Sequence, residues 1–370
     1  MPTFPAVVRR LFATLLLVVG SALLSGCAGM SYYAQAVSGQ LDVWRRARPI
    51  EDVLADATLA TATRARLERV IALRDFARDT LHLPDGGSFH AYADLGRGYV
   101  VWNVVAAPEF DLAPLQSCFL VVGCLDYRGF FSRTDAERYA ADLAARGDDV
   151  YVGGVPAYST LGWFDDPVLN TFLAWPEIDL AELIFHELAH QRLYVPDDTR
   201  FNESFASAVA EAGVLAWFAH DPAAHGRAVA ELARQRRVAR LVLDLRADLA
   251  TLYGGGSDAA SKRRHKAELF EGLRARLRAS AGEQPGDAYE TWVAAPWNNA
   301  RVAALVTYND FVDDFLALFE ACGGDYERFY RSAAAAARAP ADRRLAALHR
   351  EAQHCTGQPP ARAGENAPGL

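Results

Sequence analysis

The chain has 370 residues, of which 51% are hydrophobic and 23% are charged, and its formal net charge at pH 7 is −8. That apolar fraction suffices to bury a large core in one elaborated domain. Lysine and arginine are scattered among the acidic residues without forming a basic stripe, which argues against a nucleic-acid partner.

The first 26 residues have the pattern of an export signal. Two arginines precede an apolar run over residues 11–24, which is too short for a membrane span. The run ends in Leu-Ser-Gly-Cys at residues 24–27, which resembles a bacterial lipobox. This resemblance implies a signal peptide over 1–26, lipid on the sulfur of Cys27 and, with Ala28 following, sorting to the outer membrane. We therefore expect a periplasm-facing lipoprotein of the bacterial cell envelope, held to the membrane by an N-terminal lipid anchor. The alternative is an ordinary cleaved signal with an incidental cysteine.

Short predicted elements occupy the chain before residue 179. Helical periodicity predicts a helix over residues 61–81. Runs rich in β-formers then predict three short strands: 89–92, 99–105 and 119–122. Thr134 with Glu137 is typical of a helix start, Gly147 would close that helix, and a strand is expected over 150–152.

Four further cysteines are expected to pair. In an exported chain, Cys118, Cys124, Cys322 and Cys355 suit two disulfides, for which three connectivities exist. We favour the local pairs Cys118–Cys124 and Cys322–Cys355. A cysteine zinc site is the alternative, although no C-x-x-C spacing supports it.

The word His186-Glu187-Leu188-Ala189-His190 is the most informative feature of the chain. Histidines at i and i+4 project from one face of a helix, where both can bind one Zn²⁺. Glu187 lies one residue further round, within reach of a water on the metal. Asp179 with Glu182 predicts the start of this helix, and Leu183, Ile184, Leu188 and Leu193 form its apolar stripe.

The next predicted helix supplies a third ligand. Asp198 and Thr199 are candidate N-caps, and residues 200–220 are apolar at helical spacing. A catalytic zinc site needs three protein ligands and one open position, and a carboxylate from a following helix is a common third ligand. Glu203 is therefore the candidate.

Here the sequence resembles known peptidases. HELAHQ at 186–191 followed by NESFA at 202–206 resembles the gluzincins, especially the M1-type aminopeptidases. The resemblance implies His186, His190 and Glu203 as zinc ligands and Glu187 as general base. The gap between the two motifs is shorter here, Ser204 replaces a glycine, and no G-A-M-E-N word precedes them. The group that would bind a substrate's free amino terminus is therefore not identified.

A second resemblance covers nearly the whole chain after the signal. It is to a bacterial lipoprotein family described as predicted aminopeptidases. The matching stretches are YRGFF at 127–131, AYSTLGWF at 157–164, the two helices above, and NNAR at 298–301 leading to Tyr308.

The gluzincin layout implies a helix-rich α+β fold, with a small mixed or antiparallel sheet followed by a helical half. We expect a metallopeptidase domain over 27–355, with the sheet at about 85–178, the helices at about 179–355 and a disordered tail at 356–370. Gly254–Gly256 should separate two long helices. In this layout residues 153–160, with Tyr158 as a substrate-binding candidate, form an edge strand that pairs with a peptide; the alternative is a buried strand and turn.

Other residues have candidate roles around the metal. Tyr308 is the first choice to stabilise the oxyanion, since gluzincins place such a residue downstream, although a half-buried aromatic is an equal alternative. Asn298, Asn299 and Arg301 are candidates for substrate binding, and loop and capping duty is an equal alternative for the two asparagines. Tyr253 and Arg301 are weaker candidates to stabilise the oxyanion. Glu211 could support a ligand histidine or meet a substrate ammonium, and a solvated helix face is the alternative.

The chain is therefore expected to be a zinc-dependent peptidase, specifically an aminopeptidase, acting on peptides. The alternative from another class is a non-catalytic zinc-containing envelope lipoprotein that binds peptide or a protein partner. Retention of Glu187 favours the enzyme, because a structural zinc does not need a general base. Hydrolysis of another amide uses the same chemistry and stays open.

Overall fold

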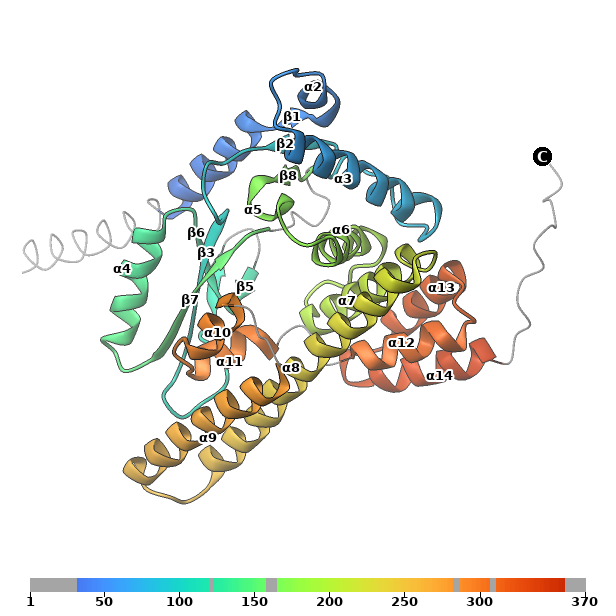
Figure 1. The fold of residues 1–370 in the computed structure, drawn as a ribbon. Coiled ribbons are helices and arrows are strands. Elements are labelled where there is room, and N and C mark those ends of the chain that lie inside the picture. Colours follow the sequence, from blue (N-terminus) through green and yellow to red (C-terminus); the bar gives the residue numbers. More distant parts are fainter. Residues whose placement is uncertain (1–31, 120–122, 158–164, 282–286, 307–310, 357–370) are drawn as a thin grey trace, which may run out of the picture.

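A computed structural model describes residues 32–119, 123–157, 165–281, 287–306 and 311–356 (Figure 1). The expectations for the signal peptide, for Cys27 and for the tail lie outside these residues. Helices predominate and the strands gather in the first half of the chain, which confirms a helix-rich α+β fold.

The first sheet joins the start of the described chain to its middle. A helix over residues 32–46 leads to β1 (Arg48–Pro49), α2 (Ile50–Leu54) and α3 (Thr61–Asp79), which confirms the helix expected from residue 61. β1 pairs antiparallel with β2 (Ala91–Ala93), and β2 pairs in parallel with β8 (Val168–Leu169). The sheet part therefore begins well before residue 85. A two-residue strand such as β1 has no alternating pattern by which the sequence could indicate it.

The second sheet is antiparallel, with β3 (Val101–Ala107) between β6 (Arg128–Phe130) and β7 (Asp149–Val155). The strands expected over 99–105 and 150–152 are confirmed with shifted ends. α4 (Arg133–Ala144) covers one face, where its Ala136, Ala140 and Leu143 pack with side chains of β3 and β6. Its N-cap is Ser132, which accepts a hydrogen bond from the Asp135 N–H at 3.3 Å, so the expected start at Thr134 was too late.

A separate hairpin carries the first disulfide. β4 (Ser117–Phe119) pairs antiparallel with β5 (Gly123–Leu125), and Cys118 stands opposite Cys124, to which it is bonded. The strand expected over 119–122 thus begins at Ser117, while residues 120–122 lie outside the described part. Cross-strand neighbours are close enough for a disulfide, which is why a local pairing is possible here.

The helical half starts with α5 (Asn170–Leu173), α6 (Glu177–Arg192) and α7 (Thr199–Trp217). α6 and α7 pack side by side beneath α3 in Figure 1. Ile184 and Phe185 of α6 and Phe201 and Phe205 of α7 are fully buried in the largest core cluster. This core fixes how the two helices face each other.

A long helical arm extends from this core. α8 (Pro222–Gly254) and α9 (Ala259–Ser280) run back along each other, and the break between them falls at Gly254–Gly256 as expected. α10 (Asp287–Ala294) and α11 (Asn299–Val306) pack against the arm in a second core cluster. α11 also contacts β3 and β7, so it connects the arm to the second sheet.

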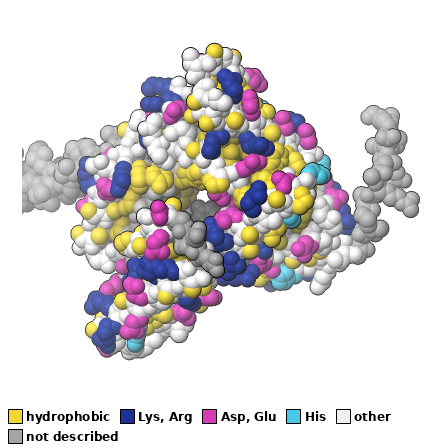
Figure 2. All heavy atoms as spheres, in the orientation of Figure 1, with side chains coloured by type: hydrophobic (Ala, Val, Ile, Leu, Met, Phe, Trp, Pro, Cys, Tyr) yellow, Lys and Arg dark blue, Asp and Glu magenta, His cyan; other side chains and the backbone are white. Residues whose placement is uncertain are grey.

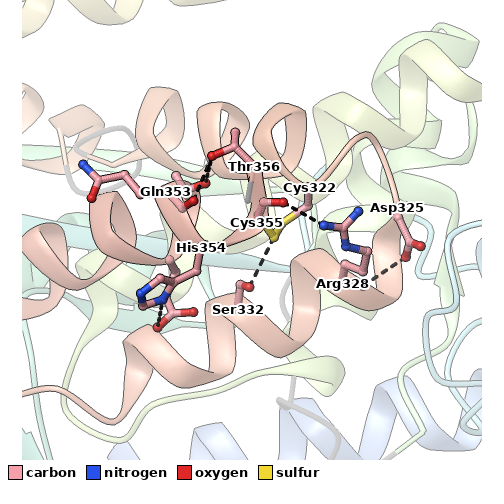
Figure 3. The surroundings of a disulfide bond; sticks show 10 residues. Cys322, Asp325, Arg328, Ser332, Gln353, His354, Cys355 and Thr356 are labelled. Carbon is pink, nitrogen blue, oxygen red and sulfur yellow. Dashed lines mark hydrogen bonds and ion pairs between the residues drawn. A yellow bond between two sulfur atoms is a disulfide. The ribbon is translucent and has the colours of Figure 1, made fainter. Parts of the chain in front are cut away.

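The C-terminal helices support α7 from below. They are α12 (Val312–Ala321), α13 (Tyr326–Ala337), the 3₁₀ turn η1 (Ala341–Arg343) and α14 (Arg344–Thr356). The disulfide Cys322–Cys355 ties the end of α12 to α14, and Arg328 Nη2 donates to the Cys355 carbonyl at 2.8 Å (Figure 3). Both disulfides are the pairs favoured from the sequence. Among the described helices, none has the length and apolar character needed to cross a bilayer.

Candidate metal centre

α6 presents the two histidines towards the middle of the molecule. It begins at Glu177 after Pro176, two residues before the start expected at Asp179. The first-turn carboxylates Glu177 and Asp179 face the positive end of the helix dipole. With Ile184 and Leu188 anchored in the core, the i, i+4 spacing brings His186 and His190 to the same side.

The turn between α6 and α7 sets the position of Glu203. Asn202 closes this turn: its Oδ1 accepts from the Val195 N–H at 2.8 Å, and its Nδ2 donates to the Val195 carbonyl at 2.7 Å. Asp198 caps α7 by accepting from the Phe201 N–H at 2.9 Å, as expected. The asparagine of NESFA therefore has a structural role that the sequence analysis missed, although its place beside Glu203 was a signal.

Three side-chain atoms converge at this point. His186 Nε2 lies 3.1 Å from His190 Nε2 and 3.2 Å from Glu203 Oε2, and His190 Nε2 lies 3.7 Å from Glu203 Oε1. Ligands at 2.0–2.1 Å in a tetrahedral zinc site lie roughly 3.3–3.5 Å apart. The separations bracket that value, and two imidazoles with a carboxylate are a zinc donor set. The residues therefore fit the metal.

The electrostatics of the cluster keep Glu203 ionised. Burial pushes the pKa of Glu203 upward, but hydrogen bonds from His186 and His190 outweigh it and lower that pKa to about 2. Burial opposes a charge on His186, yet the hydrogen bond to Glu203 and the charges of Glu187, Glu203 and Glu182 leave its pKa raised. Side-chain exposure is 18% for His186, 4% for His190 and 17% for Glu203, so the site is largely shielded from solvent.

Glu187 stands beside the cluster with a free oxygen. Its Oε2 is buried and has no hydrogen-bond partner among the described residues. A small pocket lies against Glu187 and is also lined by Gln191, Ser88 and Asp166. Gln191 Nε2 donates to Ser88 Oγ at 3.0 Å, which ties the end of α6 to the loop before β2. Figure 2 shows this face of the molecule hollowed between the sheets and the α6–α7 pair.

The downstream asparagines are engaged elsewhere. Asn298 donates to the Val150 carbonyl at 2.8 Å and accepts from the Arg301 N–H at 2.9 Å, so it caps α11 and joins it to β7. Asn299 is fully buried, accepts from the Tyr253 hydroxyl at 2.7 Å and donates to the carbonyls of Pro108, Glu109 and Asp111. These contacts replace the substrate-binding interpretation of Asn299 with a structural one.

Arg301 is also structural. Its side chain is only 2% exposed and donates to the carbonyls of Trp292, Ala295 and Pro296 at the end of α10. Its guanidinium lies 4.0 Å from the centroid of the Trp297 ring. A group enclosed in this way cannot contact a peptide, so the substrate-binding expectation for Arg301 was wrong.

Two acidic residues near the cluster differ from expectation. Glu211 is buried and forms a two-pronged ion pair with Arg236, so it is not a solvated helix-face carboxylate. Glu182, expected only as a cap, lies one turn before His186 on α6 and accepts from Gln235 Nε2 at 3.1 Å. Its i−4 spacing from His186 was the overlooked signal.

Two tyrosines that the sequence suggested for the site cannot be placed. Tyr158 and Tyr308 lie outside the described residues. Tyr127, in the turn between β5 and β6, is 38% exposed, and besides burial the negative charge of Glu203 is one of the causes that raise the pKa of its hydroxyl. It belongs to the YRGFF stretch, so the sequence offered a signal for it too.

Comparison with known proteins gives one match. Residues 31–348 match the model of a protein family described as "Putative aminopeptidase". No curated protein matches the chain, and no solved structure does. The matched range includes every helix that carries the metal cluster.

Proposed function

The chain belongs to the "Putative aminopeptidase" family, and from this premise we propose that it is a zinc-dependent aminopeptidase of the gluzincin type. The observation that carries the proposal is the convergence of His186, His190 and Glu203 beside the free carboxylate oxygen of Glu187. A site with three protein ligands leaves one coordination position for water or substrate.

His186, His190 and Glu203 would hold the zinc ion, whose positive charge would polarise a peptide carbonyl and lower the pKa of a bound water. Glu187 accepts the proton of the attacking water and delivers it to the leaving amine nitrogen. Its buried, unpartnered Oε2 suits this role, because no described residue competes for the proton. A tyrosine hydroxyl, from Tyr308 or from Tyr127, stabilises the developing oxyanion.

β7 is suited to align an extended peptide. It pairs with β3 on one side, and no other described strand pairs with it. The Asn298 side chain donates a hydrogen bond to the Val150 carbonyl near one end of β7. The part of β7 near Gly153 and Gly154 is therefore the part proposed to pair with a substrate strand. Main-chain pairing of this kind binds peptides with little regard to their side chains.

The same proposal places the enzyme in the bacterial envelope. The lipobox at residues 24–27 supports lipid attachment at Cys27, which would anchor the catalytic domain to the membrane facing the periplasm. The mass of the mature N-terminal peptide distinguishes a lipidated cysteine from an ordinary signal cleavage.

The test compares matched peptide amides with free and with acetylated N-termini. We expect the zinc-loaded protein to cleave the free-amine set, a chelator to abolish cleavage, and Glu187→Gln to lower kcat by about 10²–10⁴-fold. Zinc content should be the same in the variant, because Glu187 is not a ligand. Glu177→Gln is the matched control, since Glu177 lies on the same helix but accepts a hydrogen bond from Trp217 Nε1. Undiminished hydrolysis by zinc-bound Glu187→Gln would refute the mechanism; zinc binding without any hydrolysis by the wild type would favour the peptide-binding lipoprotein.

A further inference from the structure

We propose that Glu182 binds the free α-ammonium group of the substrate, and so makes this site an aminopeptidase site. The inference rests on the proposed function. It assigns to Glu182 a task for which the sequence offered Glu211 as a candidate.

Glu182 shares a helix face with the metal cluster. It precedes His186 by four residues on α6, so the two side chains are neighbours with Cβ atoms about 6 Å apart. Both are partly buried, while the residues between them that face the core are fully buried.

No lysine or arginine among the described residues forms an ion pair with the Glu182 carboxylate. Its hydrogen-bond partner is the neutral amide of Gln235. Other shielded carboxylates have cationic partners: Glu211 with Arg236, Asp149 with Lys266, and Asp198 with Arg344. Among the described residues, Glu182 differs from these three carboxylates in having only an amide as its hydrogen-bond partner.

The surroundings of Glu182 disfavour its ionised form. Burial raises the pKa of Glu182 to about 7, and the negative charges of Asp179 and Glu211 act in the same direction against the hydrogen bond from Gln235. A ligand with a positive charge would offset the cost of holding this carboxylate ionised. The chemistry of the position therefore selects a cation.

A peptide amino terminus fits this position in charge and in reach. An ammonium group brings one positive charge and three N–H donors. In the first residue of a peptide, the nitrogen lies only about 2.5 Å from the carbon of the scissile carbonyl, as the N–Cα and Cα–C bond lengths dictate. A carbonyl held by the metal cluster therefore puts the ammonium within a few ångströms of the face that carries Glu182. Glu211 cannot take this role, because Arg236 already neutralises it.

The test compares Glu182→Gln with the wild type on the matched free-amine and N-acetylated peptide amides. We expect kcat/KM for the free-amine peptide to fall by about 10- to 100-fold, the range for one lost hydrogen bond between charged groups. The rate on the acetylated peptide should stay within about threefold. Glu231→Gln is the control, because Glu231 is a carboxylate on α8 that is already paired with Arg234. This control should leave both rates unchanged.

A binding measurement separates this inference from the proposed function. In the metal-free protein, an NMR titration should show tighter binding of leucine amide than of N-acetyl-leucine amide, and Glu182→Gln should abolish the difference. Glu182→Asp keeps the charge and should restore part of the preference for leucine amide. That result would show that the loss in Glu182→Gln does not come from a folding defect. An unchanged preference in Glu182→Gln, or an equal loss on both peptides, would overturn the inference. If the wild type hydrolyses nothing, the proposed function fails, and the titration still decides the role of Glu182.

Discussion

Arg301→Met is expected to weaken folding without affecting substrate binding. Arg301 Nη2 donates to the Trp292 carbonyl at 2.6 Å, and Nη1 donates to the carbonyls of Ala295 at 2.9 Å and Pro296 at 3.2 Å. The guanidinium also lies over the Trp297 ring. Methionine keeps most of the length of the side chain but has no charge and no donor, so three carbonyls at the end of α10 lose their partner.

The magnitude follows from two opposing effects. Burial lowers the pKa of Arg301 to about 10 from 12.5. At about 1.4 kcal/mol per pKa unit, this means that burying the charge costs about 3 kcal/mol. Each hydrogen bond from a charged donor contributes at least about 1.5 kcal/mol, and stacking on a tryptophan adds about 1 kcal/mol. The favourable contacts win, and the substitution should lower the free energy of unfolding by roughly 2–3 kcal/mol.

The assay is urea unfolding of both proteins, followed by steady-state kinetics well below the unfolding transition. We expect the midpoint to fall and KM to stay within about twofold, because Arg301 does not reach the cleft. A tenfold rise in KM with unchanged stability would show that Arg301 contacts substrate and that the structural reasoning is wrong.

Two further predictions concern stability. Since burial raises the pKa of Glu182 to about 7, the folded, zinc-free protein holds a proton that the unfolded chain releases near pH 4.5. The contribution of Glu182 to the free energy of unfolding is therefore complete below pH 4.5 and is lost as the pH rises through 7, by up to about 3 kcal/mol. Between pH 5 and pH 8, the free energy of unfolding in urea should decline less in Glu182→Gln than in the wild type. An identical decline in both proteins would contradict this. Replacing Cys322 and Cys355 by alanine should lower the free energy of unfolding by about 3–4 kcal/mol, and replacing Cys118 and Cys124 should lower it by about 2 kcal/mol. The reason is that the bridged residues are 33 and 6 positions apart, and the entropy that a disulfide removes from the unfolded chain grows with the length of the closed loop. Equal losses in thermal or chemical unfolding would contradict the loop-entropy argument.

Local periodicity determined the elements that carry the site. The i, i+4 spacing of His186 and His190 needs only a helix, and α6 is a helix. Asp198 was identified as a cap because a capping side chain bonds to its own first turn. Helix starts were misplaced by a few residues: α4 is capped by Ser132, upstream of Thr134, and α6 begins after Pro176, upstream of Asp179.

Tertiary structure alone decided how distant residues are used. Asn299 bonds to the carbonyls of Pro108, Glu109 and Asp111, between 188 and 191 residues away, and no local pattern encodes such a contact. Glu203 comes to the histidines only because the Asn202 turn and the α6–α7 core fold the second helix back onto the first.

The same distinction separates Glu182 from Glu211. In the sequence both are acidic residues on helices near the motif, and Glu211 was the one assigned a possible ammonium. Packing of α8 against the site supplies Arg236 to Glu211 and only an amide to Glu182. The chain itself thus determined the His-Glu-x-x-His motif, because its spacing is local. The assembled fold decided that Glu211 pairs with an arginine while Glu182 receives only an amide, because charge pairing depends on neighbours that only tertiary contacts supply.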